Sequence, residues 1–343
     1  MERKRTKSGN IRLADVAELA EVSLITASRF FSNPGALSVG KRERVESAAK
    51  QLGYVPNLAA RALASQRTEI IGVLIPSLTN SVFSDVLRGI YDASEGSRYS
   101  IQLGNTRYSI LQEEKLLRVF QSQRPAGLIV TGINQTEASR AILQTMNCPI
   151  AQIMEIGPDP VDMMVGFSHY DAGFAAASHL LAQGFQRIGF LGARMDPRVQ
   201  RRFAGYVDAL KAASRFDPRY IVTTPTSTTV TLGGTLFADL LAQAPDIEAV
   251  FCVNDDLALG VLFECQRRHI QIPEQMAIVG FNDLEFMASA VPPLTSVRSN
   301  RYEMGKSAVT MVTAAIDGFR PQELVVDLGF KLMIRHSSIA RRT

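Results

Sequence analysis

The sequence predicts a small all-α helix-turn-helix unit followed by a two-lobed α/β core with parallel sheets. Two patterns and the length lead to this fold class. Apolar residues recur at helical spacing near the N-terminus, whereas apolar runs of strand length alternate with helical stretches after residue 68. Such alternation is typical of right-handed βαβ units and buried parallel sheets. A chain of 343 residues is also too long for one ordinary domain.

The N-terminal unit is predicted from three short helices. The first spans residues 13–20, whose apolar residues recur at i, i+3, i+4 and i+7. Ser23 can cap a second helix over residues 24–31, because its hydroxyl can accept a bond from a free backbone N–H. The third helix follows Ser38 and ends before Gly53. Two short helices across a tight turn, with a third behind them, form a helix-turn-helix.

The core is predicted from strands that alternate with helices. Apolar runs predict strands at 70–75, 99–103, 127–131, 188–191, 249–253 and 277–281. Helical stretches are expected at 83–93, 111–121, 172–183, 203–213, 232–242 and 257–269. Six or more strand–helix units are more than one sheet readily holds. The pattern therefore favours two doubly wound lobes that face one another across a cleft over a single sheet. Residues 291–297 lack a helical pattern and are a candidate for a strand that crosses between the lobes.

The excess positive charge lies at one end of the chain. The formal net charge is +4, and residues 1–70 hold 12 Lys+Arg against 7 Asp+Glu, whereas the remainder holds 25 against 26. A basic terminal module on a near-neutral body favours a polyanion partner at that end. The alternative interpretation is a solvated basic face without a partner.

Composition and cysteine usage indicate a globular protein of the reducing cytoplasm. Hydrophobic residues make up 46% of the chain and charged residues 20%, which excludes wholesale disorder. No apolar run reaches the length of a membrane span, and the first ten residues lack the apolar region of a secretory signal. Cys148, Cys252 and Cys265 are an odd number at wide spacing, so they predict neither a disulfide framework nor a metal knuckle.

The sequence does not carry the motifs of an enzyme. Phosphate-binding glycine loops, metalloprotease and nucleophile-elbow patterns are all missing, and the four histidines are not at metal-ligand spacing. Asp255 and Asp256 form an acidic pair, but they follow a strand and open a helix, where Asp commonly caps. We therefore expect no catalytic residues, no metal and no cofactor. A cleft without catalytic equipment suggests a binding protein.

Several segments resemble the LacI family of bacterial transcription regulators. They are LADVA at 13–17, LGYVPN at 52–57, IGVLIP at 71–76, RIGFLG at 187–192 and VFCVNDDLALG at 250–260. The likeness runs in order along nearly the whole chain, and within the family it is greatest to repressors of gluconate utilisation. The resemblance implies a helix-turn-helix domain at 1–56, a hinge helix and linker at 57–68, and an effector-binding and dimerisation core of the periplasmic-binding-protein type at 69–343.

The resemblance and the helix-turn-helix geometry assign a DNA-contacting surface. The N-terminal residues of the second helix enter the major groove, so Leu24, Ile25 and Arg29 would read bases. Core packing is the alternative for the two apolar residues. Glu21 stands where the family turn usually carries Gly or Asn, so a left-handed backbone is costly there, and we expect its acidic group to point away from DNA. The expected phosphate contacts are Arg12, Ser23, Thr26, Ser28 and Asn57. Leu63 matches the leucine that wedges into the minor groove and kinks the duplex.

The resemblance also assigns an effector pocket. Arg202 matches the family arginine that grips the ligand from the far lobe, and Asn254 and Asn282 match polar positions on the cleft rim. The family often has aspartate where Asn282 stands, and an uncharged amide removes a repulsion against an anionic ligand. Arg194 adds a nearby cation, with Arg198 and Arg201, and an arginine fork suits a carboxylate. Phe83 and Asn80 are expected on the near lobe. The threonine-rich residues 223–231 add hydroxyls, which suit a sugar acid better than a purine. The alternative interpretation is that these arginines belong to a solvated charged loop and bind no ligand.

The combined prediction is a repressor that binds double-stranded palindromic operator DNA as a homodimer, with a tetramer left open. Gluconate, or a phosphorylated or keto relative, would close the cleft and lower operator affinity. One alternative keeps the family but makes the ligand a co-repressor or activator. Another is a transport-type sugar-binding protein or a sugar-modifying enzyme, which the N-terminal module and the lack of catalytic motifs oppose.

Overall fold

The computed structural model describes residues 11–32, 34–55 and 68–339. The chain separates into two units, Met1–Thr68 and Glu69–Thr343. Across the described residues, no helix is both long enough and apolar enough to pass through a bilayer.

The N-terminal unit is a three-helix cluster. It contains α1 (Leu13–Leu19), α2 (Leu24–Ser32), the short 3-10 turn η1 (Pro34–Ala36) and α3 (Val39–Leu52). Gly53 ends α3 with a φ of +65°, a left-handed conformation that glycine adopts without strain. Five buried apolar residues fill the space between the helices: Val16, Ala20, Val45, Ala48 and Ala49. The predicted helix-turn-helix is therefore confirmed, with boundaries shifted by one residue.

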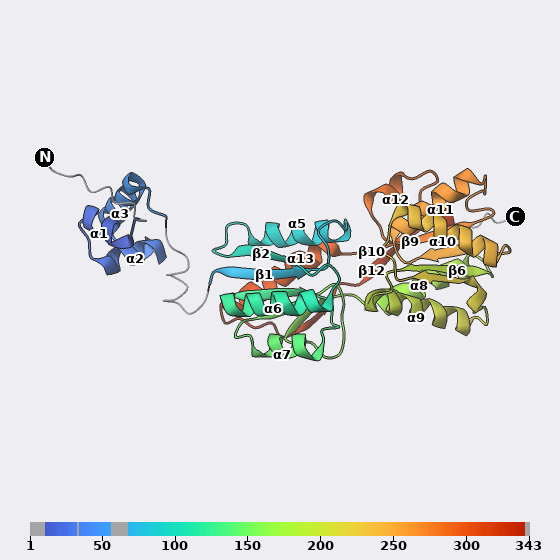
Figure 1. The fold of residues 1–343 in the computed structure, drawn as a ribbon, viewed down its shortest axis with the longest axis horizontal. Helices are drawn as coiled ribbons and strands as arrows, with labels where there is room; N and C mark the ends of the chain where they lie inside the picture. Colours follow the sequence, from blue (N-terminus) through green and yellow to red (C-terminus); the bar gives the residue numbers. More distant parts are fainter. Residues whose placement is uncertain (1–10, 33, 56–67, 340–343) are drawn as a thin grey trace. The chain divides into compact units, whose positions relative to one another are not determined.

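The first lobe of the core is a six-stranded parallel sheet with helices on both faces (Figure 1). Its strands are β1 (Ile70–Ile75), β2 (Ser100–Asn105), β3 (Gly127–Thr131), β4 (Ile150–Ile153), β5 (Met163–Gly166) and β11 (Val325–Asp327). They lie in the order β11-β5-β4-β3-β1-β2. Its helices are α5 (Val82–Ser94), α6 (Ile110–Gln123), α7 (Glu137–Thr145) and α13 (Arg301–Ile316).

Alternation along β1 explains why both faces of this sheet are covered. Successive side chains of a strand point to opposite faces. Ile71, Val73 and Ile75 belong to the buried cluster that includes residues of α5 and α13. Leu74 points the other way, into a cluster with Leu117 and other residues of α6 and α7. A strand that is buried on both sides reads as the continuous apolar run from which β1 was predicted.

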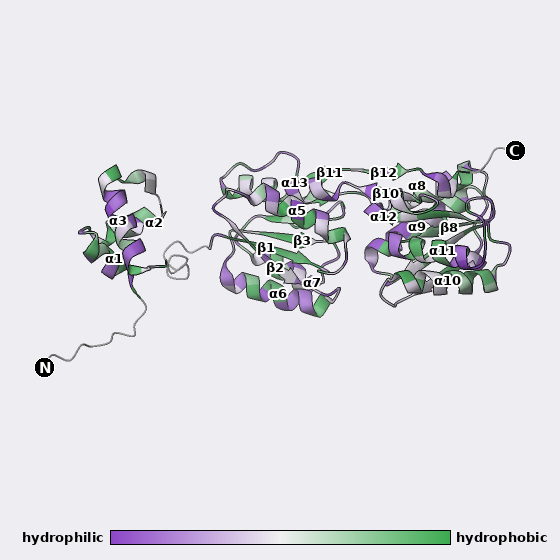
Figure 2. Ribbon diagram, turned by 90° about the horizontal axis from the view of Figure 1, so that it is seen from above, coloured by the Kyte–Doolittle hydropathy of each residue, from purple (hydrophilic) through white to green (hydrophobic). Residues whose placement is uncertain are grey.

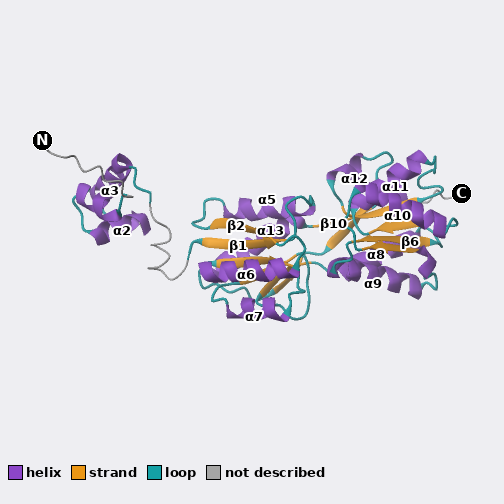
Figure 3. Cartoon of the chain, viewed as in Figure 1, coloured by secondary structure: helices purple, strands orange, loops and turns teal. Residues whose placement is uncertain are grey.

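The second lobe repeats the same arrangement. Its strands are β6 (Ile188–Ala193), β7 (Ile221–Thr224), β8 (Ala249–Cys252), β9 (Ala277–Asn282), β10 (Thr295–Ser299) and β12 (Phe330–Met333), in the order β12-β10-β9-β8-β6-β7. Its helices are α8 (His169–Ala182), α9 (Pro197–Ala212), α10 (Val230–Gln243), α11 (Asp255–Arg267) and α12 (Glu285–Ser289). The short 3-10 turns are η2 (Pro218–Tyr220) and η3 (His336–Ser338). Helices α8 and α9 pack together on one face, and α10 and α11 on the other (Figure 3).

The two lobes are joined by three crossings of the chain. The chain leaves the first lobe after β5, returns to it between β10 and α13, and leaves it again between β11 and β12. The predicted crossing strand at 291–297 is present in part, because β10 starts at Thr295 and leads directly toward α13. The predicted parallel sheets are confirmed, except that β12 runs antiparallel to β10.

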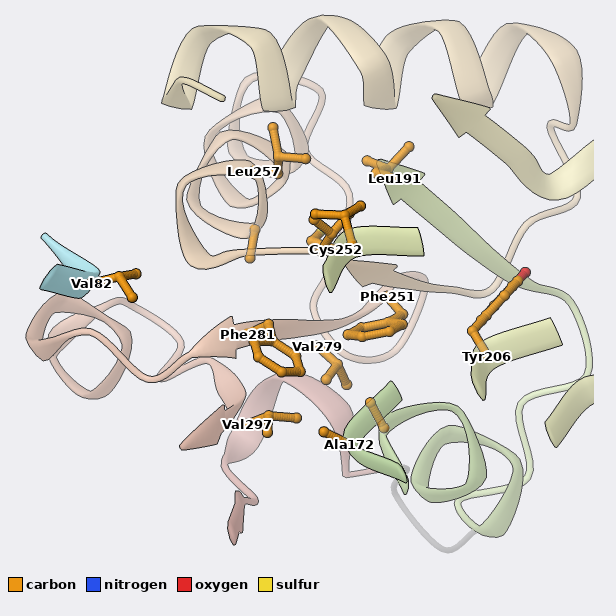
Figure 4. Close-up of a cluster of buried hydrophobic side chains, with 14 of the residues drawn as sticks. Val82, Ala172, Leu191, Tyr206, Phe251, Cys252, Leu257, Val279, Phe281 and Val297 are labelled. Carbon is orange, nitrogen blue, oxygen red and sulfur yellow. The ribbon is translucent and has the colours of Figure 1, made fainter. Parts of the chain in front are cut away.

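Apolar side chains concentrate on the strands of both lobes. Figure 2 shows most strands in green, with purple concentrated on the helices. In the second lobe, Phe251 and Phe281 lie with ring centroids 6.5 Å apart, and Figure 4 shows Val279 beside them. Since Phe281 is the penultimate residue of β9, this part of the core lies directly under the loops at the carboxyl ends of the strands.

Candidate functional site

Helix α2 presents one exposed face and one buried face. Leu24 and Ile25 are 54% and 72% exposed, whereas Ala27 is fully buried. Ser28 and Arg29 are exposed as well. At about 100° per residue, these four exposed positions fall on one side of the helix. The prediction that Leu24 and Ile25 lie outside the core is therefore confirmed, and their contact with bases stays a prediction.

The turn before α2 is held by local contacts. The Ser23 hydroxyl accepts a hydrogen bond from the Thr26 backbone N–H at 3.2 Å and is 2.9 Å from the Thr26 hydroxyl, so Ser23 caps the helix as predicted. Glu21 has a φ of +51°, and its carboxylate lies 3.9 Å from the guanidinium of Arg44 on α3. Arg12 is exposed just before α1.

The other two residues predicted to contact DNA, Asn57 and Leu63, lie outside the described residues. Their roles remain predictions.

A pocket lies between the two lobes of the core. The first lobe lines it with residues that follow β1, β2 and β4 and with the start of α5. The second lobe lines it with residues at or after the ends of β6, β7, β8 and β9 and with the first half of α9. In α/β proteins, ligands bind at the carboxyl ends of parallel strands. The pocket brings together all six residues predicted for the effector: Asn80, Phe83, Arg194, Arg202, Asn254 and Asn282. Eight more residues line it: Val82, Tyr108, Met154, Ala193, Asp196, Arg198, Val199 and Thr228.

Arg202 is a buried cation held by three neighbours. Its Nε donates to His169 Nδ1 at 3.1 Å, and its Nη1 donates to the Val253 carbonyl at 2.6 Å. Its guanidinium carbon lies 3.6 Å from the centroid of the Phe281 ring. Burial lowers the pKa of Arg202 to about 9, so the group is charged at neutral pH. The structure shows no hydrogen bond from its Nη2 to any described residue, which leaves one edge of the fork for a ligand.

Arg194 meets the first lobe through an aromatic ring. Its guanidinium carbon lies 3.8 Å from the centroid of the Tyr108 ring, which is a cation–π contact. Asn80 Nδ2 donates to the Tyr108 hydroxyl at 3.0 Å, so Asn80 fixes the ring. Arg194 and Tyr108 have φ angles of +63° and +57°, a left-handed backbone that side chains with a Cβ rarely adopt. Strain of this kind clusters at functional sites.

Arg198 and Asp196 stand at the first turn of α9. The Asp196 carboxylate accepts hydrogen bonds from the backbone N–H groups of Arg198 and Val199, and it lies 3.5 Å from Arg198 Nη2. Burial alone would raise the pKa of Asp196, but Arg198, Arg202 and the two N–H groups hold it below its usual value. Asp196 is therefore ionised and is the one carboxylate among the residues that line the pocket.

The two asparagines predicted on the rim differ in what holds them. Asn254 caps α11, because its Oδ1 accepts from the Leu257 N–H at 3.1 Å, and this leaves its Nδ2 for the pocket. Asn282 is 6% exposed and has a φ of +114°. Its backbone carbonyl accepts from Arg301, and its side chain has no hydrogen-bond partner among the described residues.

Arg201 faces away from these residues and contacts the first lobe. Its Nη2 donates to Asn134 Oδ1 at 2.8 Å, and its Nη1 lies 2.8 Å from Glu155 Oε1. Burial raises the pKa of Glu155, and Arg201, Arg198 and Arg202 oppose that shift. Arg201 therefore holds the lobes together beside the pocket and does not line it.

The structure reduces the expected contribution of the threonine-rich segment and adds two site residues that the sequence did not predict. Of the threonine-rich residues 223–231, only Thr228 lines the pocket, while Thr229 caps α10. Phe83 is 2% exposed and lines the wall as predicted. Tyr108 and His169 escaped prediction, because a tyrosine in a loop and a histidine in a helix carry no local signal of the partners they meet.

Profiles of known families match both units of the chain. Residues 12–57 match the family described as bacterial regulatory proteins, lacI family, and residues 177–338 match a periplasmic binding protein-like domain. Among curated proteins, the HTH-type transcriptional regulator GntR of Pseudomonas aeruginosa is 40% identical over 336 residues, which cover 98% of each chain.

Solved structures give the same picture. A Lacl family transcriptional regulator from Silicibacter pomeroyi is 35% identical and has a TM-score of 0.89, and the match covers 96% of this chain and 100% of that one. The transcription regulator GntR from Chromobacterium violaceum is 41% identical with a TM-score of 0.76, over 78% of this chain and 99% of that one.

Proposed function

The chain belongs to the LacI family of bacterial regulatory proteins, and from this premise we propose that it represses transcription until a sugar acid fills the pocket between its lobes. The relatives named above are transcriptional regulators and not enzymes, and the chain is a DNA-binding regulator of the same kind. The resemblance drawn from the sequence is thus confirmed. The effector that we propose is D-gluconate.

The net positive charge of the pocket lining is the main support for a sugar acid as the ligand. Arg194, Arg198 and Arg202 line it, and Asp196 is the only lining residue of opposite charge in the described chain. Two positive charges in excess favour an anionic ligand, and the open edge of the Arg202 fork suits a carboxylate. Asn254 and Asn282 supply amides for hydroxyl groups. A pocket of this kind fits a polyhydroxy acid better than a neutral sugar.

Operator binding is assigned to the exposed face of α2. Leu24, Ile25 and Arg29 would read base edges, and Arg12, Ser23, Thr26 and Ser28 would contact phosphates, joined by Asn57. Leu63 would enter the minor groove. A homodimer would place two such faces on the halves of a palindromic operator.

The ligand can release DNA only by preferring one state of the protein. A hundredfold preference for the form that does not bind the operator is worth about 2.7 kcal/mol. Because the pocket is built from both lobes, a ligand held by Arg202 and covered by Phe83 and Tyr108 would fix their separation. Residues 57–68 would transmit that change to the DNA-binding unit.

Fluorescence anisotropy tests the proposal. Labelled DNA from upstream of the gene for this protein, and of neighbouring sugar genes, is titrated with the full chain in the presence of D-gluconate or D-glucose. We expect sub-millimolar gluconate to dissociate the complex and glucose to leave it intact. A complex tightened by gluconate would reverse the sign and indicate a co-repressor. Indifference to gluconate would discard this ligand and favour phosphorylated or keto sugars.

A further inference from the structure

One buried histidine joins the two lobes to the proposed effector arginine. His169 is the first residue of α8, at the point where the chain passes from the first lobe to the second, and it is 1% exposed. Its Nε2 lies 2.9 Å from the Met154 carbonyl of the first lobe. Its Nδ1 lies 3.1 Å from Arg202 Nε of the second.

The two partners fix which ring nitrogen carries the proton. A carbonyl oxygen can only accept a hydrogen bond, so Nε2 must donate to Met154. A guanidinium N–H can only donate, so Nδ1 must accept from Arg202. The neutral ring with the proton on Nε2 satisfies both contacts, and a protonated ring would place an N–H against the N–H of Arg202.

The surroundings keep the ring neutral and in place. Burial lowers the pKa of His169 well below its usual value, and the charges of Arg202, Arg198 and Arg201 lower it further. The ring centroid lies 4.4 Å from that of Phe167 and 5.9 Å from that of Phe281. Since Arg202 lies over the same Phe281 ring, histidine and arginine share one apolar support.

We propose that His169 is a positioning residue that fixes the Arg202 guanidinium plane for an anionic effector. With Nε held by His169 and Nη1 by the Val253 carbonyl, two directions of the planar fork are set. The fork then cannot rotate, and its Nη2 edge is the one left for the carboxylate. This inference rests on the proposed function of Arg202 as the effector arginine.

His169 also couples the orientation of the Arg202 guanidinium to the distance between the two lobes. The acceptor for the ring is the Met154 carbonyl, at a first-lobe residue with a φ of +75°, whereas Arg202 belongs to a second-lobe helix. A change in the separation of Met154 and Arg202 must break or bend one of the two bonds of His169. The arginine is therefore ordered for ligand only when the lobes hold this spacing.

Two substitutions separate the two bonds of the ring. In His169→Asn, the amide oxygen occupies the place of Nδ1, so it can still accept from Arg202 while the bond to Met154 is lost. In His169→Gln, the amide nitrogen occupies the place of Nε2, so it can still donate to Met154 while Arg202 loses its acceptor. A histidine that merely fills space would make the two variants equivalent.

Calorimetric titration of the full chain with D-gluconate measures the effect. We expect His169→Asn to bind within about threefold of the wild type and His169→Gln to bind about tenfold or more weakly, since an unpaired buried donor is costly. In an Arg202→Ala background, His169→Gln should have no further effect on gluconate binding. Thermal unfolding of each variant establishes that it is folded.

The outcomes distinguish the two proposals. Wild-type gluconate affinity in Arg202→Ala would overturn the effector site itself. Loss of binding in Arg202→Ala, with equal affinities for His169→Asn and His169→Gln, would overturn only the role of His169. A His169→Gln effect that persists in the Arg202→Ala background would also overturn it, because His169 would then act through another group.

Discussion

The two lobes of the core share one strand order, although the edge strand β12 runs antiparallel where β11 runs parallel, and they present different chemistry to the pocket. Their strand orders, β11-β5-β4-β3-β1-β2 and β12-β10-β9-β8-β6-β7, correspond strand for strand. The first lobe lines the pocket with uncharged side chains: Asn80, Val82, Phe83, Tyr108 and Met154. Every charged residue of the lining comes from the second lobe: Arg194, Asp196, Arg198 and Arg202.

The difference lies in the loops and the first turns of the helices that follow the strands, and not in the sheets. Equivalent strands end at the pocket in both lobes, so the fold supplies two similar edges and leaves the chemistry to the residues that follow. The second lobe provides charged side chains that can bind the ligand, which we call the grip. The first lobe provides uncharged, mostly apolar and aromatic side chains, which we call the cover. Recognition of the ligand and closure over it are therefore separable, and substitutions in the two lobes should fail in different ways.

The largest effect is expected in the second lobe at Arg202. Arg202→Ala should weaken D-gluconate binding at least about a hundredfold, or about 2.7 kcal/mol, because it removes a buried cation from the pocket. Calorimetric titration measures the loss, and operator binding in the absence of ligand should survive. The matched control is Lys211→Ala, which removes an exposed positive charge from the same helix, α9. An equal loss in both variants would show that net charge matters and the grip does not.

Adding a negative charge to the same lobe should give a smaller loss. Asn282→Asp places a carboxylate at the pocket, and aspartate, like asparagine, tolerates a positive φ better than other side chains with a Cβ. We expect gluconate to bind about tenfold more weakly, or about 1.4 kcal/mol, because like charges repel. The loss should not extend to a neutral sugar. Unchanged gluconate affinity would place the carboxylate of the ligand far from Asn282.

The buried histidine between the lobes, His169, predicts that the stability of the fold depends on pH. The pKa of His169 is lowered in the folded chain, so below its unfolded pKa of about 6.5 the unfolded state binds a proton that the folded state does not. The contribution of His169 to stability should therefore fall by about 1 kcal/mol over the first pH unit below about 6.5. His179 has a lowered pKa as well and adds to this loss. Asp255 and Glu113, whose pKa is raised to about 7, act in the opposite direction in both the wild type and the variant. Chemical unfolding at pH 7 and 5.5 should show a shallower loss in His169→Asn, and an identical slope would contradict a neutral His169.

The smallest effect is expected in the cover supplied by the first lobe. Tyr108→Ala removes the cation–π contact with Arg194, which at a site of this exposure is worth about 0.5–1 kcal/mol, or a few-fold in affinity. Tyr108→Phe keeps the ring and loses only the bond from Asn80, so it should lie between Tyr108→Ala and the wild type. Gluconate titrations of the two variants give the comparison. A Tyr108→Ala loss as large as that of Arg202→Ala would remove the distinction between grip and cover.

The strands show which parts of the fold are predictable from sequence. β1 and β3 begin and end where the apolar runs predict, because a strand buried on both faces must be apolar throughout. The four-residue strands β4 and β5 are equally buried, yet they are too short for a run to stand out. The edge strand β11 is partly exposed and carries little apolar signal.

The pocket shows the same division. Arg202, Asn254 and Asn282 were predicted because they sit in segments that resemble a known family, and the structure places them together. His169, Tyr108 and Glu155 were not, because the arginines that they meet are more than 30 residues away in the sequence and on other elements. Contacts of that kind arise from packing, which no local pattern records.

The most direct test of the account compares an acid with its neutral analogue on the wild-type protein. Calorimetric titration of the full chain with D-gluconate and with D-glucitol, its open-chain neutral counterpart, replaces the carboxylate by a hydroxymethyl group and changes little else. The charged second lobe predicts sub-millimolar binding of gluconate and at least about tenfold weaker binding of glucitol. Equal affinities, or a preference for glucitol, would contradict the central claim that the arginines of the second lobe select a sugar acid.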